Sequence, residues 1–596
     1  MKQNWALYRQ VLAILPASAR RFLLVYATLQ GLLAIIDGAA LALLALVLSP
    51  LVSGEPVTLP VFGTVSGAGV IGPLILVCAL IVLKGVLALT LYWVATRRFS
   101  RYELELGARL FGGFVNSPWT DRLKRNSSDL VRITDGSVST TISGFVLPGA
   151  SLIGEALNFL TLLAVLAVAQ PLIGATTLVY LGIIGLLLNF QISRRTRQAG
   201  LVALRYSLRS SRLITEMIGA LKEVTLRGKT DEVAEVVRAN RVFSTRARAN
   251  AQFLGQVPRY VLETAIIGGI VLVGLIGFAI GGIGGATAAV AIFGLAGFRM
   301  APSLVRFQGV LSQLNVSAPH AQAVVDQVHR SEELTAHLAE RDSQPLPVVP
   351  TSITLQDVTF RYAPDADPAV EGISLEIPFG SNVAFVGASG AGKSTMVDLL
   401  LGLIEPTSGT VMVDGIPLTS LTQAWRSRVA YVPQEVSLFD ATVAQNVALT
   451  WSGDADPDRV TTALRKAHLL ETIEARVGGI DGRVGERGLA LSGGQRQRMG
   501  IARALYVDPL VLVMDEATSA LDTATEAAVT ASIAELHGST TTITVAHRLS
   551  TIKKADQIFF LSGGRLLAQG TFDELVHAVP EFALQAALAG LAGPAD

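Results

Sequence analysis

The chain has 596 residues, of which 51% are hydrophobic and 16% charged, and its mean hydropathy is +0.50. These values exceed what a soluble globular protein of this length carries, so part of the chain is expected to lie in lipid. The net charge of +1 gives no reason to expect a nucleic-acid partner, and the single cysteine, Cys78, excludes an internal disulfide framework or a cysteine-rich zinc site.

Six apolar stretches are each long enough to cross a hydrocarbon core of about 30 Å. They cover approximately residues 22–49, 70–96, 142–169, 171–192, 260–280 and 283–308. The segments 97–141 and 193–259 between them are rich in arginine, whereas the shorter connections contain no lysine or arginine. By the positive-inside rule, the long segments and both termini are expected to be cytoplasmic. We therefore predict a multi-pass integral membrane protein, of a bacterial inner or cell membrane.

The two long cytoplasmic segments keep a helical spacing of apolar residues, which predicts helical extensions below the membrane. The first extension is expected to turn near 116–129, where Pro118 and a polar cluster interrupt the pattern. A short helix at the membrane interface is expected before the first crossing, because Arg20 and Arg21 directly precede it. The expected domains are an interfacial helix (1–20), a transmembrane domain (21–325), a linker (326–350), an α/β domain (351–590) and a tail (591–596).

Six charged residues lie within the apolar stretches, where charge is costly and usually serves function. Glu263, near the start of one stretch, is interpreted as an anchor at the membrane interface; the other five are Asp37, Lys84, Glu155, Arg299 and Arg306. We interpret these five as candidates for the lining of a polar substrate cavity. Asp37 and Lys84 lie near the middle of neighbouring predicted helices, so a structural ion pair between these two side chains is an equally open interpretation.

A phosphate-binding loop is predicted in the α/β domain, where GASGAGKS follows an apolar strand and opens a helix. Glycines let backbone N–H groups approach phosphates, Lys393 supplies charge to the β- and γ-phosphates, and Ser394 can ligate magnesium. The residues assigned to nucleotide binding here are Gly387, Ala388, Ser389, Gly390, Ala391, Gly392, Lys393, Ser394 and Thr395.

Two carboxylates end a buried apolar strand in LVLVMDEATSALD (510–522). Asp515 at the end of the strand can hold the magnesium shell, and Glu516 beside it is placed to orient or deprotonate water. Together with the phosphate loop, this pair predicts hydrolysis of a nucleoside triphosphate.

The phosphate loop, the stretch LSGGQ (491–495) and MDEATSALD occur in the order and spacing of a nucleotide-binding domain of the ATP-binding cassette (ABC) transporters. With six helices ahead of it, nearly the whole chain resembles an export-type half-transporter. The implied fold is an all-α six-helix membrane domain of the export type fused to an α/β P-loop ABC ATPase domain, with ATP and Mg²⁺ as cofactors.

The resemblance also implies roles for single residues. Tyr362 would stack on adenine, Gln434 would reach magnesium and the attacking water, and His547 would contact the γ-phosphate. Asp522 would couple two sites across a dimer. The signature residues would contact the ATP of a partner chain; they are Leu491, Ser492, Gly493, Gly494 and Gln495.

A second copy of the chain is the expected partner, because none of these motifs is degenerate; a heterodimer stays possible. FRMAPSLVRF (298–307) and IIDGAALALLALVLSPL (35–51) weakly resemble flippases of lipid-linked oligosaccharides, which favours an amphipathic, lipid-linked substrate. Multidrug or peptide export, import of the siderophore type, and an ATP-gated channel or regulator are the alternatives.

Overall fold

The computed structural model describes residues 2–53, 57–59, 63–65, 71–169, 171–339, 344–517, 521–546, 549–588 and 591. The chain forms two compact units. One contains Met1–Ser117 and Asp121–Thr335, and the other contains Pro118–Thr120 and Ala336–Asp596. The three residues Pro118–Thr120 come from the turn predicted near 116–129, and the ring of Trp119 packs against a hydrophobic core of the second unit.

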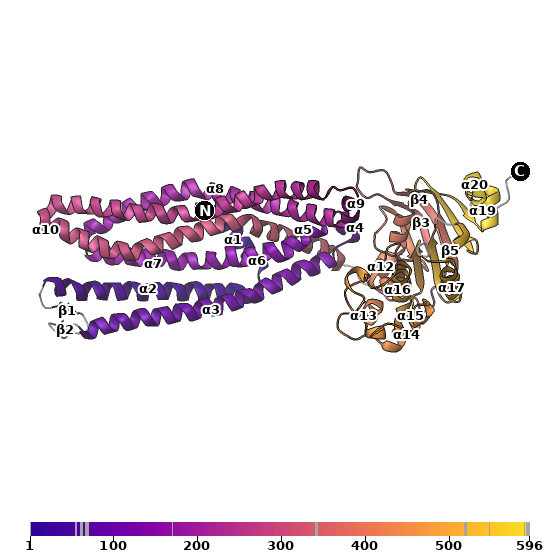
Figure 1. The fold of residues 1–596 in the computed structure, drawn as a ribbon, viewed down its shortest axis with the longest axis horizontal. Helices are drawn as coiled ribbons and strands as arrows, with labels where there is room; N and C mark the ends of the chain where they lie inside the picture. Colours follow the sequence, from indigo (N-terminus) through magenta and orange to yellow (C-terminus); the bar gives the residue numbers. More distant parts are fainter. Residues whose placement is uncertain are drawn as a thin grey trace. The chain divides into compact units, whose positions relative to one another are not determined.

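Long helices build the first unit (Figure 1). They are α1 (Lys2–Ile14), α2 (Ala17–Ser53), α3 (Ile71–Val115), α7 (Leu147–Ala169), α8 (Pro171–Gly219) and α10 (Thr230–Ala339). Short helices are α4 (Trp119–Leu123), α5 (Ser127–Val131), α6 (Val138–Thr141) and α9 (Leu221–Leu226), with π-helical turns η2 (Arg132–Ser137) and η3 (Ile142–Val146). Strands β1 (Val57–Leu59) and β2 (Gly63–Val65) pair antiparallel between α2 and α3.

The helix α10 consists of two arms that reverse at Gly281 and Gly282, where the backbone leaves helical geometry. Gly282 has a φ of 61°, which a residue with a side chain rarely adopts. The arms then run back along each other, since a Cβ on Gly277 would lie 2.7 Å from the carbonyl oxygen of Gly285. The predicted apolar stretches 260–280 and 283–308 are these two arms.

Five helical stretches of the described chain are long and apolar enough to cross a membrane, and they correspond to the first five predicted crossings. The sixth predicted crossing, 283–308, is helical in the second arm of α10 but is not among these five. Many large apolar side chains of the five stretches are exposed, as expected for surfaces that face lipid. The predicted cytoplasmic extensions are also helical, because α3 continues to Val115 and α8 continues to Gly219.

Two predicted boundaries differ from the structure. The helix predicted at 1–20 is α1, which ends at Ile14, and α2 begins at Ala17, directly after the helix-breaking Pro16. The linker predicted at 326–350 is helical as far as Ala339, because apolar residues such as Val328 pack into the helical core. Residues 592–596 of the predicted tail lie outside the described residues.

Two sheets form the centre of the second unit. The larger has the order β12-β11-β5-β10-β9-β8, parallel except for the antiparallel pair β11 and β12; the smaller, β4-β3-β6-β7, is antiparallel. The strands are β3 (Ser352–Phe360), β4 (Val370–Pro378), β5 (Asn382–Val386), β6 (Ser408–Val413), β7 (Ile416–Pro417), β8 (Val429–Val432), β9 (Val511–Asp515), β10 (Thr541–Val545), β11 (Gln557–Ser562) and β12 (Arg565–Gly570).

Helices of the second unit pack into three hydrophobic cores. One core joins both sheets to α11 (Lys393–Leu400), and a second joins β8 and β9 to α16 (Gly493–Tyr506). The remaining helices are α12 (Leu418–Arg426), α13 (Val443–Ala448), α14 (Pro457–Lys466), α15 (Leu470–Glu474), α17 (Thr523–Ala534), α18 (Leu549–Ile552), α19 (Phe572–Ala578) and α20 (Pro580–Leu588), with 3₁₀ turns η4 (Gly479–Asp481) and η5 (Glu486–Gly488). This is the predicted α/β domain.

Candidate nucleotide and substrate sites

The predicted phosphate loop connects the central strand β5 to the N-terminus of α11. Glycine is required at two of its positions. A Cβ on Gly387 would lie 2.1 Å from the carbonyl oxygen of Leu561, and one on Gly392 would lie 2.6 Å from that of Ala369. Gly392 also has a φ of 98°. The loop therefore leaves its backbone N–H groups beside a helix N-terminus, which suits the phosphates of a nucleotide.

Lys393 is buried, and its Nζ donates hydrogen bonds to the carbonyl oxygens of Gly387 (2.7 Å) and Ala388 (3.0 Å). Burial lowers the pKa of Lys393, whereas the carboxylates of Glu516 and Asp515 act in the opposite direction. The ammonium group is thus held above the loop, near both predicted catalytic carboxylates. A phosphate in the loop would offer this ammonium a stronger acceptor than the two carbonyl groups.

Asp515 and Glu516 lie at the carboxyl end of β9, which pairs in parallel with β8 and β10. The hydroxyl of Tyr431 donates to Asp515 Oδ2 at 3.2 Å, and burial together with the charge of Asp515 raises the pKa of Tyr431. Gln434 Nε2 donates to Glu516 Oε2 at 2.9 Å. The structure therefore brings the loop glutamine and the predicted catalytic base together.

Glu516 is one of the few non-glycine residues with positive φ, at 48°. Its backbone N–H donates to the carbonyl oxygen of Val545 at the end of β10. The chain therefore turns directly after the strand in a strained backbone conformation, and the carboxylate of Glu516 reaches Gln434.

The signature residues begin α16. Ser492 caps this helix: its Oγ accepts from the N–H of Gln495 (3.3 Å), and Gln495 Oε1 accepts from the N–H of Ser492 (2.9 Å). Leu491 is buried, whereas a Cβ on Gly493 would meet no other atom within 4 Å. The helix N-terminus is therefore well formed and sterically open beside Gly493.

The same helix contacts the loop that carries Gln434, which the sequence analysis did not predict. Gln497 is buried, and its Nε2 donates to the carbonyl oxygen of Pro433 at 3.1 Å. A Cβ on Gly500 would lie 2.5 Å from Val436. An amide at the second position after the GGQ motif was a possible signal, but its partner lies far away in the sequence.

Asp398 is a further residue near the site that the sequence analysis missed. Burial, followed by the charge of Asp515, raises the pKa of Asp398 to about 6, and a hydrogen bond from the side chain of Trp119 opposes this shift. A half-buried acid in the helix that follows the phosphate loop was the available signal.

Three further residues have predicted roles, and the structure describes two of them. Tyr362 is partly exposed, and its hydroxyl lies 3.1 Å from Thr395 Oγ1. Asp522 caps α17 by accepting from the N–H and the hydroxyl of Thr525, and these bonds lower the pKa of Asp522. His547 lies outside the described residues. The predicted roles of Tyr362 and His547 in nucleotide binding and of Asp522 in dimer coupling stay predictions.

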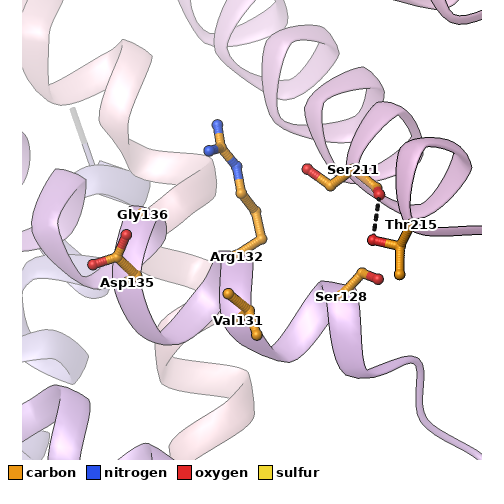
Figure 2. Close-up of a pocket in the computed structure, with 7 residues that line it drawn as sticks. All are labelled: Ser128, Val131, Arg132, Asp135, Gly136, Ser211 and Thr215. Atoms are coloured by element: carbon orange, nitrogen blue, oxygen red, sulfur yellow. Dashed lines mark hydrogen bonds between the residues drawn. The ribbon is translucent and has the colours of Figure 1, made fainter. Parts of the chain in front are cut away.

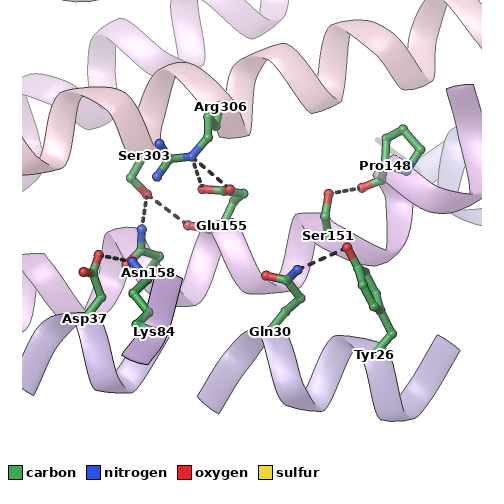
Figure 3. A network of polar contacts seen from close by, with 10 residues as sticks. All are labelled: Tyr26, Gln30, Asp37, Lys84, Pro148, Ser151, Glu155, Asn158, Ser303 and Arg306. Atoms are coloured by element: carbon green, nitrogen blue, oxygen red, sulfur yellow. Dashed lines mark hydrogen bonds and ion pairs between the residues drawn. The ribbon is translucent and has the colours of Figure 1, made fainter. Parts of the chain in front are cut away.

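The membrane charges form two ion pairs (Figure 3). Lys84 Nζ lies 2.8 Å from Asp37 Oδ2 and joins α3 to α2. Arg306 Nε donates to both carboxylate oxygens of Glu155, at 3.0 and 3.1 Å, and joins the second arm of α10 to α7. The side chain of Arg299 lies outside the described residues.

A cavity of about 370 Å³ lies between the α5 to η2 segment and α8 (Figure 2). Its lining residues are Ser128, Val131, Arg132, Asp135, Gly136, Ser211 and Thr215. The sequence analysis did not predict it, because residues that are distant in the sequence form it and the π-helical turn η2 shifts the helical spacing on one side.

These observations define the class of the protein: a P-loop ATPase domain with an ABC signature helix, in one chain with a multi-helix membrane domain. The ABC transporter family profile matches residues 370–519. An ATP-dependent lipid A-core flippase of Methylococcus capsulatus is 33% identical over 443 residues, which cover 72% of this chain and 70% of that protein. The chain belongs to the ABC transporter family.

Further comparisons agree with this assignment. Lipid A-core flippases of Ralstonia nicotianae and Burkholderia pseudomallei are 43% and 42% identical, over 38% and 40% of each chain. The chain therefore matches about two fifths of the length of these two relatives. A bacterial Atm1-family ABC exporter with ATP bound superposes with a TM-score of 0.79 and 24% identity, covering 98% of this chain and 100% of the exporter. This similarity confirms the predicted fold.

Proposed function

We propose that this protein is an ATP-driven transporter that moves an amphipathic or lipid-linked substrate across or between the leaflets of the membrane by alternating access. The observation that carries the proposal is the assembly of Lys393, Gln434, Asp515 and Glu516 at one edge of a parallel sheet, in a chain that also has a membrane domain with polar groups. The curated relatives named lipid A-core flippases support a lipid as the cargo.

The described residues fit ATP and Mg²⁺. A Cβ on Gly387 or Gly392 would collide with a backbone carbonyl oxygen, so the loop keeps the tight turn that a phosphate-binding backbone needs, and the ammonium of Lys393 rests on replaceable carbonyl groups. Bound Mg²⁺ would neutralise charge on the β- and γ-phosphates, and Ser394, Asp515 and Gln434 are the residues that would hold it. Glu516 would orient and deprotonate the attacking water, and its bond to Gln434 keeps the carboxylate in place until nucleotide binds.

Two chains are needed to complete each site in this proposal. The phosphate loop belongs to one hydrophobic core and the signature helix to another, and no hydrogen bond between described residues joins Ser492 or Gly493 to the loop. The open N-terminus of α16 would present amides and a positive helix end to the ATP of the partner chain. Because none of the nucleotide motifs is degenerate, the proposed dimer consists of two copies of this chain with two equal sites.

The proposed transport depends on a difference in the affinity of ATP for two states of the dimer. ATP can drive a change of shape only if it binds the closed dimer more tightly than the open one. Closure of the ATPase domains would open the predicted substrate cavity to the opposite side of the membrane. Hydrolysis of ATP would return the dimer to its open state. The arginine-rich segments 97–141 and 193–259 place the ATPase domains and both termini in the cytoplasm of a bacterial cell in this proposal.

The test uses purified protein in proteoliposomes with lipids that carry a fluorescent acyl chain. We expect ATP-dependent loss of probe from one leaflet in the native protein and none in the Glu516→Gln variant. Transfer that needs ATP binding but no hydrolysis, together with uncoupled solute flux, would favour a channel or regulator. Uptake in the opposite orientation would favour import, and ATP hydrolysis without movement of any lipid would contradict the proposed cargo.

A further inference from the structure

A polar seam crosses the membrane unit and comprises Glu155 and Asn158 on α7 with Ser303 and Arg306 on the second arm of α10 (Figure 3). Asn158 Nδ2 lies 3.3 Å from Ser303 Oγ, which in turn lies 3.4 Å from the backbone oxygen of Glu155. The glycines of the adjoining helix pair α2 and α7 allow close approach, since a Cβ on Gly154 would lie 2.8 Å from Gln30 Cβ. The α7 side of the seam is therefore held by the closely packed helix α2.

The cation of the seam has unused donors. Glu155 occupies only the Nε of Arg306, and the two terminal nitrogens make no hydrogen bond with a described residue. The side chain of Arg306 is 52% exposed, whereas that of Glu155 is 22% exposed. The free edge of the guanidinium can thus accept a phosphate in the bidentate manner that arginine favours.

The seam also has an unused acceptor. Asn158 is 7% exposed, and its Oδ1 has no hydrogen-bond partner among the described residues. A buried acceptor without a donor is costly, so a donor that arrives when the helices part would gain this energy. Asn158 lies one helical turn beyond Glu155, so a cationic donor between these two side chains would have one charged and one neutral acceptor.

The charge balance of the seam limits what can bind. Among the side chains that the structure describes, Arg306 and Glu155 form one base–acid pair in the seam, and Lys84 and Asp37 form a second pair nearby. Adding a net charge to a low-dielectric site is expensive, whereas a head group with one anion and one cation adds none. A zwitterion can align its anion with Arg306 and its cation with Glu155.

We infer that the substrate carries a zwitterionic aminophosphate head group whose phosphate binds Arg306 and whose N–H-bearing ammonium binds Glu155 and Asn158. This inference rests on the proposed function and names the chemical class of its cargo. It distinguishes three ordinary lipids: phosphatidylethanolamine has an ammonium with N–H donors, phosphatidylcholine has the same charge without donors, and phosphatidylglycerol has no cation.

The first experiment measures binding, independently of transport. Equimolar mixtures of the three lipids are offered to the purified full chain, and the retained lipids are quantified by native mass spectrometry. We expect phosphatidylethanolamine to exceed phosphatidylcholine about tenfold, the usual effect of a hydrogen bond to a charged group, with phosphatidylglycerol lowest. Equal retention, or a preference for phosphatidylglycerol, would overturn the inference.

Two variants separate the two acceptors. In Asn158→Leu, the preference for phosphatidylethanolamine over phosphatidylcholine should fall severalfold, because the uncharged acceptor is lost. In Glu155→Gln, the preference for phosphatidylcholine over phosphatidylglycerol should vanish. Thr90→Ala is the matched control, since Thr90 is an exposed membrane-helix residue that bonds only to its own helix, and it should behave as the native protein. Unchanged preferences in both seam variants would refute the site.

The same three lipids with fluorescent acyl chains then report translocation in proteoliposomes. Selective binding without any ATP-dependent movement would contradict the proposed function but support the head-group site. Movement of all three lipids at equal rates would support the function and overturn the head-group inference. The two failures are therefore distinguishable.

Discussion

The two units of this protein position their functional side chains in different ways. In the ATPase unit, short contiguous stretches determine geometry, because a glycine loop, a strand end and a helix cap each position their own side chains. In the membrane unit, the chemistry arises between helices, as in the pairs Asp37 with Lys84 and Glu155 with Arg306. The first kind of site can be recognised in a sequence, and the second needs the packing of the helices.

The largest expected effect concerns Glu516, where the contiguous type of site is tested. Glu516→Gln keeps the side-chain shape and a partner for Gln434 but removes the general base, so ATP hydrolysis should fall by about a hundredfold or more. ATP binding should persist, and the closed dimer should accumulate, as measured by size-exclusion chromatography with ATP. Unchanged turnover would contradict the assignment of Glu516 as base.

The next effect is expected for Lys393. Lys393→Ala removes a buried ammonium from the phosphate loop, and affinity for a labelled ATP analogue should drop by about a hundredfold. The assignment of this lysine to phosphate binding would fail if the variant bound the analogue normally in equilibrium dialysis.

A smaller effect on hydrolysis is expected at Gly493, and Gly500 of the same helix provides the comparison. Gly493→Ala meets no atom of its own chain, so we expect stability and ATP binding to be unchanged while hydrolysis falls about tenfold or more through the partner's site. Gly500→Ala collides with Val436 and should lower the thermal unfolding temperature instead. Full hydrolysis by a stable Gly493→Ala protein would argue against a shared site.

The smallest effect concerns the ion pair between α2 and α3. Asp37→Asn and Lys84→Met should each lower stability in detergent, and the double variant should recover part of the loss, with a coupling of about 1–3 kcal/mol. Thermal unfolding of the native protein, the two single variants and the double variant measures this coupling energy. Additive losses would show that the two charges act independently and would weaken the contrast between the units.

Much of the fold was predictable, because apolar length and arginine placement identify membrane helices, and motif order identifies the ATPase domain. The helical part of the predicted linker 326–350, up to Ala339, was not predicted, since the polar residues that end α10 look like a linker until the apolar contacts of its other face are known. Neither the bond between Gln497 and Pro433 nor the pair of Glu155 with Arg306 follows from sequence spacing, because helix rotation and depth decide such contacts.

The most direct test of the shared ATP site is complementation between two inactive chains. Lys393→Ala retains its signature helix, and a Gly493→Asp variant retains its phosphate loop, so a mixed dimer contains one site with both parts intact. Separately tagged chains are expressed together, mixed dimers are purified through both tags, and ATP hydrolysis is measured. The account predicts hydrolysis well above that of either parent dimer; activity no higher than the parents would contradict it.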